Sequence, residues 1–163
     1  MSSLSNSAKN YIKQNEKLLI KKFANPEFFV QSEKPFTIFM AGEPGAGKTE
    51  FSKSYIRELA KDDPDIQIVR IDADDIRELI PGYDGRNAFE VQGACGLGVD
   101  MLFNYIQKKK LNAIVDGTFS DFKKSREDVI RAINRKRKVE VFFIYQDPII
   151  AWDFTKKKRG FGE

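Results

Sequence analysis

The sequence predicts a three-layer αβα fold, in which helices cover both faces of a mainly parallel β-sheet and one more helix is added at the N-terminus. Two observations carry this prediction. Short apolar runs alternate along the chain with stretches whose apolar residues recur at helical spacing, which is typical of parallel sheets. In addition, an apolar run at residues 36–41 leads directly into a glycine-rich segment and then into a helical pattern. With 163 residues, the chain has the length of one domain with a full core.

The N-terminal segment is predicted to be an amphipathic helix over about residues 8–23. Apolar residues recur on one of its faces, and Asn25-Pro26 ends it. Because it precedes the first strand, we treat residues 1–34 as a helical extension. This helix is expected either to cover an edge of the sheet or to contribute to a docking surface for a partner.

Four short runs are rich in β-branched and aromatic residues, which favour strands. In chain order they are residues 36–41, 66–71, 111–115 and 139–145. Because a helical segment separates each run from the next, the strands are expected to be parallel. Residues 35–163 are therefore expected to form the main domain around this sheet.

The helices between and after the strands are recognised by apolar residues three or four positions apart and by the residues that end them. In chain order they cover about residues 48–61, 73–80, 87–109 and 122–135, and a last helix begins at Pro148. The first ends before Pro64 and the second before Pro81, because proline cannot continue a helix.

The segment Gly42-Glu43-Pro44-Gly45-Ala46-Gly47-Lys48-Thr49 fits the phosphate-binding P-loop pattern G-x-x-x-x-G-K-[S/T]. It has the strand before it and the helix after it that the motif requires. In that arrangement backbone N–H groups and the positive end of the helix dipole face one anion. Lys48 is expected to contact the phosphates of ATP during catalysis, and Thr49 to bind Mg²⁺. The expected nucleotide-binding residues are Gly42, Glu43, Pro44, Gly45, Ala46, Gly47, Lys48, Thr49 and Glu50.

Acidic residues follow two of the other strands, and ligands of such sheets gather at the carboxyl ends of the strands. Asp72 and Asp74 follow the second strand, and Asp116 follows the third. An acidic residue that closes an apolar strand beside a P-loop is typical of a Mg²⁺ ligand, and we assign this role to Asp116. The alternative is that these residues only cap a helix or a turn.

Three glycines lie inside the long predicted helix, although each costs about 1 kcal/mol there relative to alanine. Gly93, Gly96 and Asp100 are spaced to share one helix face. That face could admit a flat ligand or another backbone, with Asp100 beside it. The alternative is a helix broken at its glycines, with Asp100 exposed.

The composition limits the available chemistry. One Cys and no His exclude an internal disulfide, make a structural zinc site very unfavourable and require a general base that is a carboxylate, Lys or Tyr. A single cysteine suits a cytoplasmic protein, and no run is long enough for a membrane helix. The net charge is +4, with basic runs at residues 108–110, 135–138 and 156–159. The first two follow predicted helices, where cations complement the dipole and stay solvated, so these runs do not require nucleic acid as a partner.

Together these motifs resemble the zeta toxins, the kinases of epsilon/zeta toxin–antitoxin systems. The resemblance covers the chain from the N-terminal helix to about Arg159. Its motifs are the P-loop, Ile71-Asp72-Ala73-Asp74 with the following Arg77 and Pro81-Gly82-Tyr83, and Asp116-Gly117-Thr118. It implies a P-loop kinase that uses ATP and Mg²⁺ to phosphorylate a hydroxyl of UDP-N-acetylglucosamine. It also implies a small helical antitoxin as a partner.

The same resemblance assigns roles to individual residues. Asp72 matches the general base that acts on the sugar hydroxyl. Asp100 matches a substrate-contacting position that is usually glutamate, and Thr118 matches a substrate-contacting threonine. Asp116 stands where the family often has glutamate. Arg159 matches the first of two catalytic lid arginines that stabilise the transferring phosphoryl group.

The expected mechanism is in-line transfer of the γ-phosphoryl group, catalysed by positioning and charge neutralisation. Asp72, with an ordinary pKa of about 3.9, would be ionised at neutral pH and accept the hydroxyl proton. Zeta toxins continue past the position of Glu163 with a second lid arginine, another helix and usually a strand. We therefore expect the chain as given to transfer phosphate slowly or not at all.

Other interpretations stay open at this point. A kinase for an antibiotic, another sugar or a nucleotide would share the P-loop and differ near Asp100 and Thr118. A nucleic-acid-end kinase or RNA-binding NTPase would account for the basic runs, but the sequence has no clustered aromatic and basic platform. A non-catalytic remnant would bind only ATP or an antitoxin.

Overall fold

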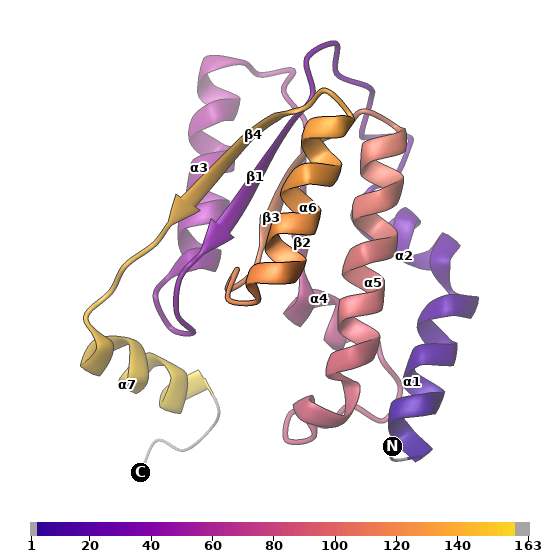
Figure 1. Ribbon diagram of the computed structural model, residues 1–163, viewed down its shortest axis with the longest axis vertical. Coiled ribbons are helices and arrows are strands. Elements are labelled where there is room, and N and C mark those ends of the chain that lie inside the picture. The colour runs from indigo at the N-terminus through magenta and orange to yellow at the C-terminus, as the bar shows by residue number, and fades with distance from the viewer. Residues whose placement is uncertain (1–2, 159–163) are drawn as a thin grey trace.

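The computed structural model describes residues 3–158 and confirms the predicted α/β class (Figure 1). In this part of the chain the strands are β1 (Phe36–Ala41), β2 (Ile68–Asp72), β3 (Asn112–Asp116) and β4 (Lys138–Phe143). They pair in parallel in the order β2-β3-β1-β4. Since all strands run the same way, their carboxyl ends meet at one edge of the sheet, toward the bottom of Figure 1.

Helices cover both faces of this sheet. α3 (Lys48–Asp62) packs on one face over a small core, and the apolar residues buried there are Ile38, Met40, Ile68 and Ile114. The larger core lies on the opposite face, under α4 (Ala73–Arg77), α5 (Ala88–Lys108) and α6 (Phe122–Asn134). α7 (Pro148–Lys158) follows β4 and lies near the carboxyl ends of the strands (Figure 1).

α5 is one continuous helix of 21 residues, so the alternative of a helix broken at its glycines is wrong. Two of its three glycines, Gly93 and Gly98, admit neighbours at short range, whereas a Cβ atom at Gly96 would meet nothing within 4 Å. A Cβ atom at Gly98 would lie 2.9 Å from Cγ2 of Ile76, and one at Gly93 would lie 2.9 Å from Cε of Lys9. The close packing of α4 and α1 against α5 therefore offsets the conformational cost of these glycines.

The helix predicted over residues 8–23 is in fact two helices, α1 (Ser3–Gln14) and α2 (Glu16–Phe23), which meet at Asn15. The side chain of Asn15 donates from Nδ2 to the backbone oxygen of Tyr11 at 2.8 Å. Asparagine competes for backbone groups in this way and favours helix ends over helix interiors. α1 packs along α5, and α2 contacts both α5 and the edge strand β2.

The N-terminal helices contribute to the larger core, which leads to a stability prediction. Leu19 is 2% exposed and belongs to this core, whereas its neighbour Leu18 is 46% exposed. Leu19→Ala is expected to lower the free energy of unfolding by about 2–5 kcal/mol, because it leaves a cavity. Leu18→Ala, the matched control, is expected to change it by about 0.5 kcal/mol or less. Denaturant unfolding followed by circular dichroism measures both.

Deleting residues 1–24 extends the same test to the whole extension. This deletion also removes Ala8 and Ile12, which are fully buried in the core. We expect the remaining chain to lose cooperative melting. A deletion variant that melts as sharply as the full chain would instead support a dispensable docking element.

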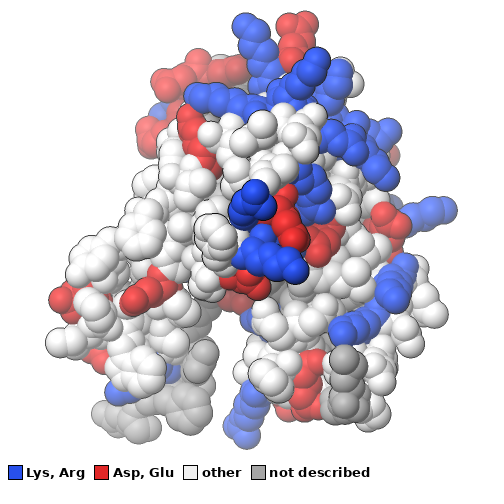
Figure 2. Space-filling model, in the orientation of Figure 1, with Lys and Arg blue, Asp and Glu red and all other residues white. Residues whose placement is uncertain are grey.

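Two of the basic runs, residues 108–110 and 135–138, lie at the edge of the sheet away from the P-loop, where α5 and α6 end, and blue side chains gather at the top of Figure 2. The third begins in α7, near the carboxyl ends of the strands. The prediction that residues 135–138 stay solvated is wrong for Arg137, which is 5% exposed. Its Nε donates to Oγ1 of Thr37 at 2.7 Å, and its Nη2 donates to the backbone oxygens of Phe36 and Leu111. Arg137 thus ties the start of β1 to the segment that enters β3.

Within residues 3–158, no helix has the length and apolar character needed to cross a membrane.

Candidate functional site

The P-loop connects β1 to α3 at the carboxyl edge of the sheet. Gly42 and Gly45 have φ angles of +136° and +82°, which side chains other than glycine rarely adopt. A Cβ atom at Gly42 would lie 2.3 Å from the backbone oxygen of Ile144. One at Gly45 would lie 2.1 Å from the backbone oxygen of Ala151 in α7. The loop therefore needs glycine for its backbone conformation and also for the space that the chain after β4 occupies.

Lys48 is the first residue of α3 and its side chain folds back over the loop. Its Nζ donates to the backbone oxygens of Gly42 at 2.8 Å and Glu43 at 2.6 Å. The ammonium group thus lies at the N-terminus of a 15-residue helix, where the helix dipole adds positive potential. An anion bound to the backbone of the loop would meet both sources of positive charge.

The two acidic residues predicted from strand ends lie side by side. Asp72 is the last residue of β2, Asp116 is the last residue of β3, and the two are register partners. Residues paired across neighbouring strands lie about 5 Å apart and point to the same face of the sheet. The carboxyl group of Asp116 is buried and that of Asp72 is half-buried. The structure therefore places a pair of carboxylates beside the start of α3.

Ser52, which the sequence interpretation did not single out, connects Asp116 to α3. Its side chain is fully buried, and its Oγ lies 3.0 Å from Oδ2 of Asp116 and 3.0 Å from the backbone oxygen of Thr49. Its position in the sequence could have identified it as a site residue, because Ser52 lies three residues after Thr49 and hence on a neighbouring part of the same helix face.

Arg70 is the second residue that the sequence interpretation missed. It lies on β2 two residues before Asp72 and therefore shares the same face of the sheet. Its Nη2 donates to Oδ2 of Asp116 at 2.9 Å and also to Oδ2 of Asp72, and its Nη1 donates to Oδ2 of Asp75 at 2.7 Å. The sequence could have identified Arg70 because it is a charged residue inside a largely apolar strand and lies two positions from a predicted site residue.

Of the two roles considered for Asp72 in the sequence, the structure shows the helix cap, and the role of general base stays a prediction. Its Oδ1 accepts a hydrogen bond of 2.8 Å from the backbone N–H of Asp74 and caps α4. Burial raises the pKa of Asp72 above its usual value, although the N–H of Asp74 and the charge of Arg70 oppose this shift. The expectation of an ordinary pKa for Asp72 is therefore wrong.

The remaining predicted residues are distributed differently. Thr118 lies next to the P-loop, since its backbone oxygen accepts a hydrogen bond of 3.2 Å from the N–H of Gly42. Asp100 belongs to a separate cluster on α5 and α6, where it pairs with Lys124 at 2.7 Å and Arg131 at 3.5 Å. Acidic and basic side chains are mixed at the centre of Figure 2, over α6. Arg159 lies outside the described residues.

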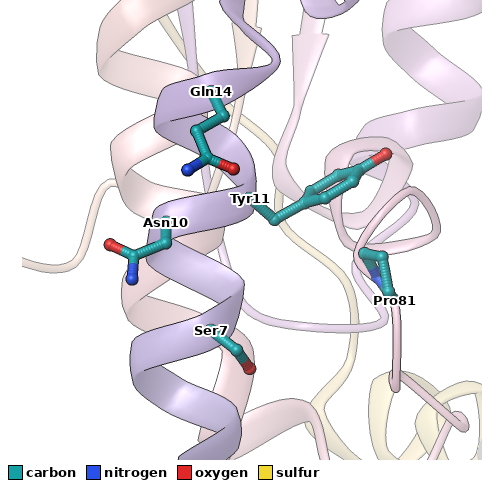
Figure 3. A pocket seen from close by; sticks show the side chains of 5 residues that line it. All are labelled: Ser7, Asn10, Tyr11, Gln14 and Pro81. Carbon is teal, nitrogen blue, oxygen red and sulfur yellow. The ribbon is translucent and has the colours of Figure 1, made fainter.

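Two hollows lie on the surface formed by α1 and its neighbours. One, of about 480 Å³, is lined by Lys9, Lys13, Gly93, Gly96, Leu97, Asp100 and Lys124. The other, of about 350 Å³, is lined by Ser7, Asn10, Tyr11, Gln14 and Pro81, with Tyr11 reaching from α1 toward Pro81 (Figure 3). Its lining carries no charged side chain, so it offers little to a phosphorylated ligand. The hollow beside Asp100 carries both signs of charge and is the better candidate for a polar acceptor.

The residues beside the P-loop suit a magnesium ion that also binds phosphate. Within residues 3–158, no group of three or more His, Cys, Asp or Glu side chains is arranged to hold a metal ion. A P-loop site does not need one, because Mg²⁺ takes a Ser or Thr hydroxyl, one or two carboxylates and phosphate oxygens. Ser52 and Arg70 both hydrogen-bond to Oδ2 of Asp116, so Oδ1 of Asp116 and the hydroxyl of Thr49 are the groups that would hold such an ion.

Comparison with known proteins gives one family and two structural relatives. The family model described as zeta toxin matches residues 21–160. A chain from the PezAT chromosomal toxin–antitoxin system of the human pathogen Streptococcus pneumoniae superposes with a TM-score of 0.71 at 20% identity, over 95% of this chain. A chain from the Pnkp1/Rnl/Hen1 complex superposes with a TM-score of 0.54 at 21% identity, over 74% of this chain.

At these identities the two structures show a shared fold. This chain spans 62% of the length of the PezAT chain and 39% of the length of the other. Comparison with curated proteins gives no significant match.

Proposed function

Because this chain belongs to the zeta toxin family, we propose that it is an ATP-dependent phosphotransferase that acts as the toxin of a toxin–antitoxin pair. The observation that carries the proposal is the register pairing of Asp72 with Asp116 beside the N-terminus of α3. This pairing brings a candidate base, a candidate Mg²⁺ ligand and a phosphate-binding loop to one edge of the sheet. These are the parts that phosphoryl transfer requires.

In the proposed mechanism, residues 42–49 bind the phosphates of ATP through backbone N–H groups, and Lys48 contacts the β- and γ-phosphates. Thr49 and Asp116 would hold Mg²⁺, which would neutralise phosphate charge during transfer. Asp72 orients the acceptor hydroxyl and takes its proton as the bond to the γ-phosphorus forms. Because its pKa is raised, the carboxylate of Asp72 would be a stronger base than that of an ordinary aspartate. Arg159 keeps its proposed role as a lid arginine.

We propose UDP-N-acetylglucosamine as the acceptor and the hollow beside Asp100 as its site. Three lysines, Lys9, Lys13 and Lys124, line this hollow together with Asp100. Ammonium groups complement a diphosphate, and a carboxylate accepts hydrogen bonds from sugar hydroxyls. Thr118 is proposed as a further contact to the substrate. A small helical antitoxin is the proposed protein partner.

Incubation of the purified chain with ATP and Mg²⁺ and a panel of acceptors, read by mass spectrometry, tests this function. The panel contains UDP-N-acetylglucosamine, other nucleotide sugars, free sugars, nucleotides, aminoglycosides and a single-stranded oligonucleotide. Among these acceptors, we expect UDP-N-acetylglucosamine to be the one that gains a phosphoryl group, however slowly, and we expect chelation of Mg²⁺ to prevent the reaction. Phosphorylation of another acceptor would support the proposed kinase activity and contradict the proposed substrate. Binding of ATP without transfer to any acceptor would favour a nucleotide-binding remnant.

A further inference from the structure

Arg70 is the best-connected ionic side chain of the candidate site. Its side chain is 12% exposed, and it extends from β2 along the face of the sheet that carries Asp72 and Asp116. All three guanidinium nitrogens donate hydrogen bonds: Nε to Ser52 and Asp116, Nη1 to Asp75, and Nη2 to Asp72 and Asp116. One side chain therefore joins the end of β2, the end of β3 and α3.

The position of Arg70 offsets the repulsion between three neighbouring carboxylates in the site. Asp72 and Asp116 are register partners on one face, and Asp75 approaches from the first turn of α4. Three carboxylates this close repel one another in a partly buried environment. A single guanidinium between them supplies the compensating charge, and its planar fork fixes the direction of each carboxylate, which an ammonium group cannot do.

These hydrogen bonds go to particular carboxylate oxygens. Oδ2 of Asp116 accepts from Arg70 and Ser52. Oδ2 of Asp72 accepts from Arg70, and Oδ1 of Asp72 accepts from the N–H of Asp74. Both carboxyl groups are thereby held in fixed rotamers. The partners of a metal ligand orient it in this way, and their loss commonly costs 10–100-fold in metal affinity or activity.

We propose that Arg70 is a positioning residue that holds the Mg²⁺ ligand Asp116 and the general base Asp72 in one rigid cluster. The inference rests on the proposed function, because it assigns those two roles to the carboxylates. Its consequence is a coupling between the two halves of the reaction: a change at Arg70 disturbs the metal and the acceptor hydroxyl together.

Arg70→Lys tests the proposal, because it keeps the positive charge and removes the fork. The first readout is ADP binding at increasing Mg²⁺, measured by isothermal titration calorimetry, and it needs no turnover. Mg²⁺ is expected to increase the affinity for ADP. In Arg70→Lys, we expect the Mg²⁺ concentration that gives half of this increase to rise about 10–100-fold, while the affinity for ADP without Mg²⁺ is unchanged. The second readout is transfer, in which we expect kcat to fall with little change in KM for the acceptor.

Arg77→Lys is the matched control. Arg77 is 14% exposed and pairs with Asp74 on α4, and its Nη2 donates to Gln92 at 2.8 Å. It is thus a second half-buried arginine of the same region, without hydrogen bonds to Asp72 or Asp116 among the described contacts. We expect Arg77→Lys to lower the melting temperature at least as much as Arg70→Lys and to leave the Mg²⁺ response within about twofold of wild type.

The outcomes separate this inference from the proposed function. Arg70→Lys with a wild-type Mg²⁺ response and kcat would make Arg70 an ordinary ion pair and overturn the inference. Equal losses in Arg70→Lys and Arg77→Lys, tracking the fall in melting temperature, would overturn it as well. If wild type phosphorylates no acceptor, the proposed function fails, yet the Mg²⁺ response of ADP binding in the three proteins still decides the role of Arg70.

Discussion

Replacing Asp72 with asparagine is expected to reduce phosphoryl transfer by about 10²–10⁴-fold, the usual effect of removing a general base. Asparagine has the same shape, and its Oδ1 can still accept the hydrogen bond from the N–H of Asp74 that caps α4. It cannot accept the proton of the acceptor hydroxyl. We therefore expect kcat to fall while the affinity for ATP stays close to wild type. The melting temperature should also fall, because asparagine removes the carboxylate charge that pairs with Arg70. Steady-state transfer and ATP titration measure the two effects separately.

Asp74→Asn is the matched control for this experiment. Asp74 lies two residues away, is exposed and forms an ion pair with Arg77 at the start of α4. We expect this variant to transfer phosphate at nearly the wild-type rate. The reverse result, an inactive Asp74→Asn and an active Asp72→Asn, would move the base to Asp74 and leave the class of reaction intact.

Lys48→Ala is expected to weaken ATP binding by about 10- to 150-fold. A hydrogen bond to a charged group contributes about 1.5–3 kcal/mol, and each 1.4 kcal/mol is a factor of ten in affinity. The side chain of Lys48 donates to backbone oxygens of the loop and belongs to neither hydrophobic core, so we expect the fold to survive the change. Titration with ATP and Mg²⁺, together with a melting curve, gives the affinity and checks the fold.

The control for Lys48 is Lys53→Ala, which removes an equal charge from an exposed position on the same helix. We expect this variant to bind ATP as wild type does. If Lys48→Ala also binds ATP with unchanged affinity, the segment at residues 42–49 does not bind phosphate, and the proposed function loses its premise.

Local patterns account for how far the fold could be predicted from the sequence. The apolar runs predicted as strands at 36–41 and 111–115 correspond to β1 (Phe36–Ala41) and β3 (Asn112–Asp116), because a buried parallel strand is apolar along its whole length. Distant contacts decide the outcome where local preference is weak or misleading. The long helix predicted over 87–109 is continuous in α5, and the alternative of a broken helix is wrong, because α1 and α4 pack against it. Arg137 is buried because backbone oxygens of Phe36 and Leu111 surround its guanidinium.

By itself, the sequence determined the parts of this protein that are contiguous in the chain. The P-loop is a single run of residues between a strand and a helix, so its spacing already carries the backbone geometry that phosphate binding needs. The acidic residues at strand ends followed from the same local logic, because a parallel sheet brings those ends to one edge.

Only the tertiary structure decided which of these residues meet. The strand order makes Asp72 and Asp116 register partners, although 44 positions separate them in the sequence. The fold also lets Arg70 hydrogen-bond to both aspartates and Ser52 to Asp116. It places Asp100 in a separate ion cluster with Lys124. The physical reason is that pairing between strands and packing between helices depend on burial summed over the whole molecule. No window of the sequence contains that sum.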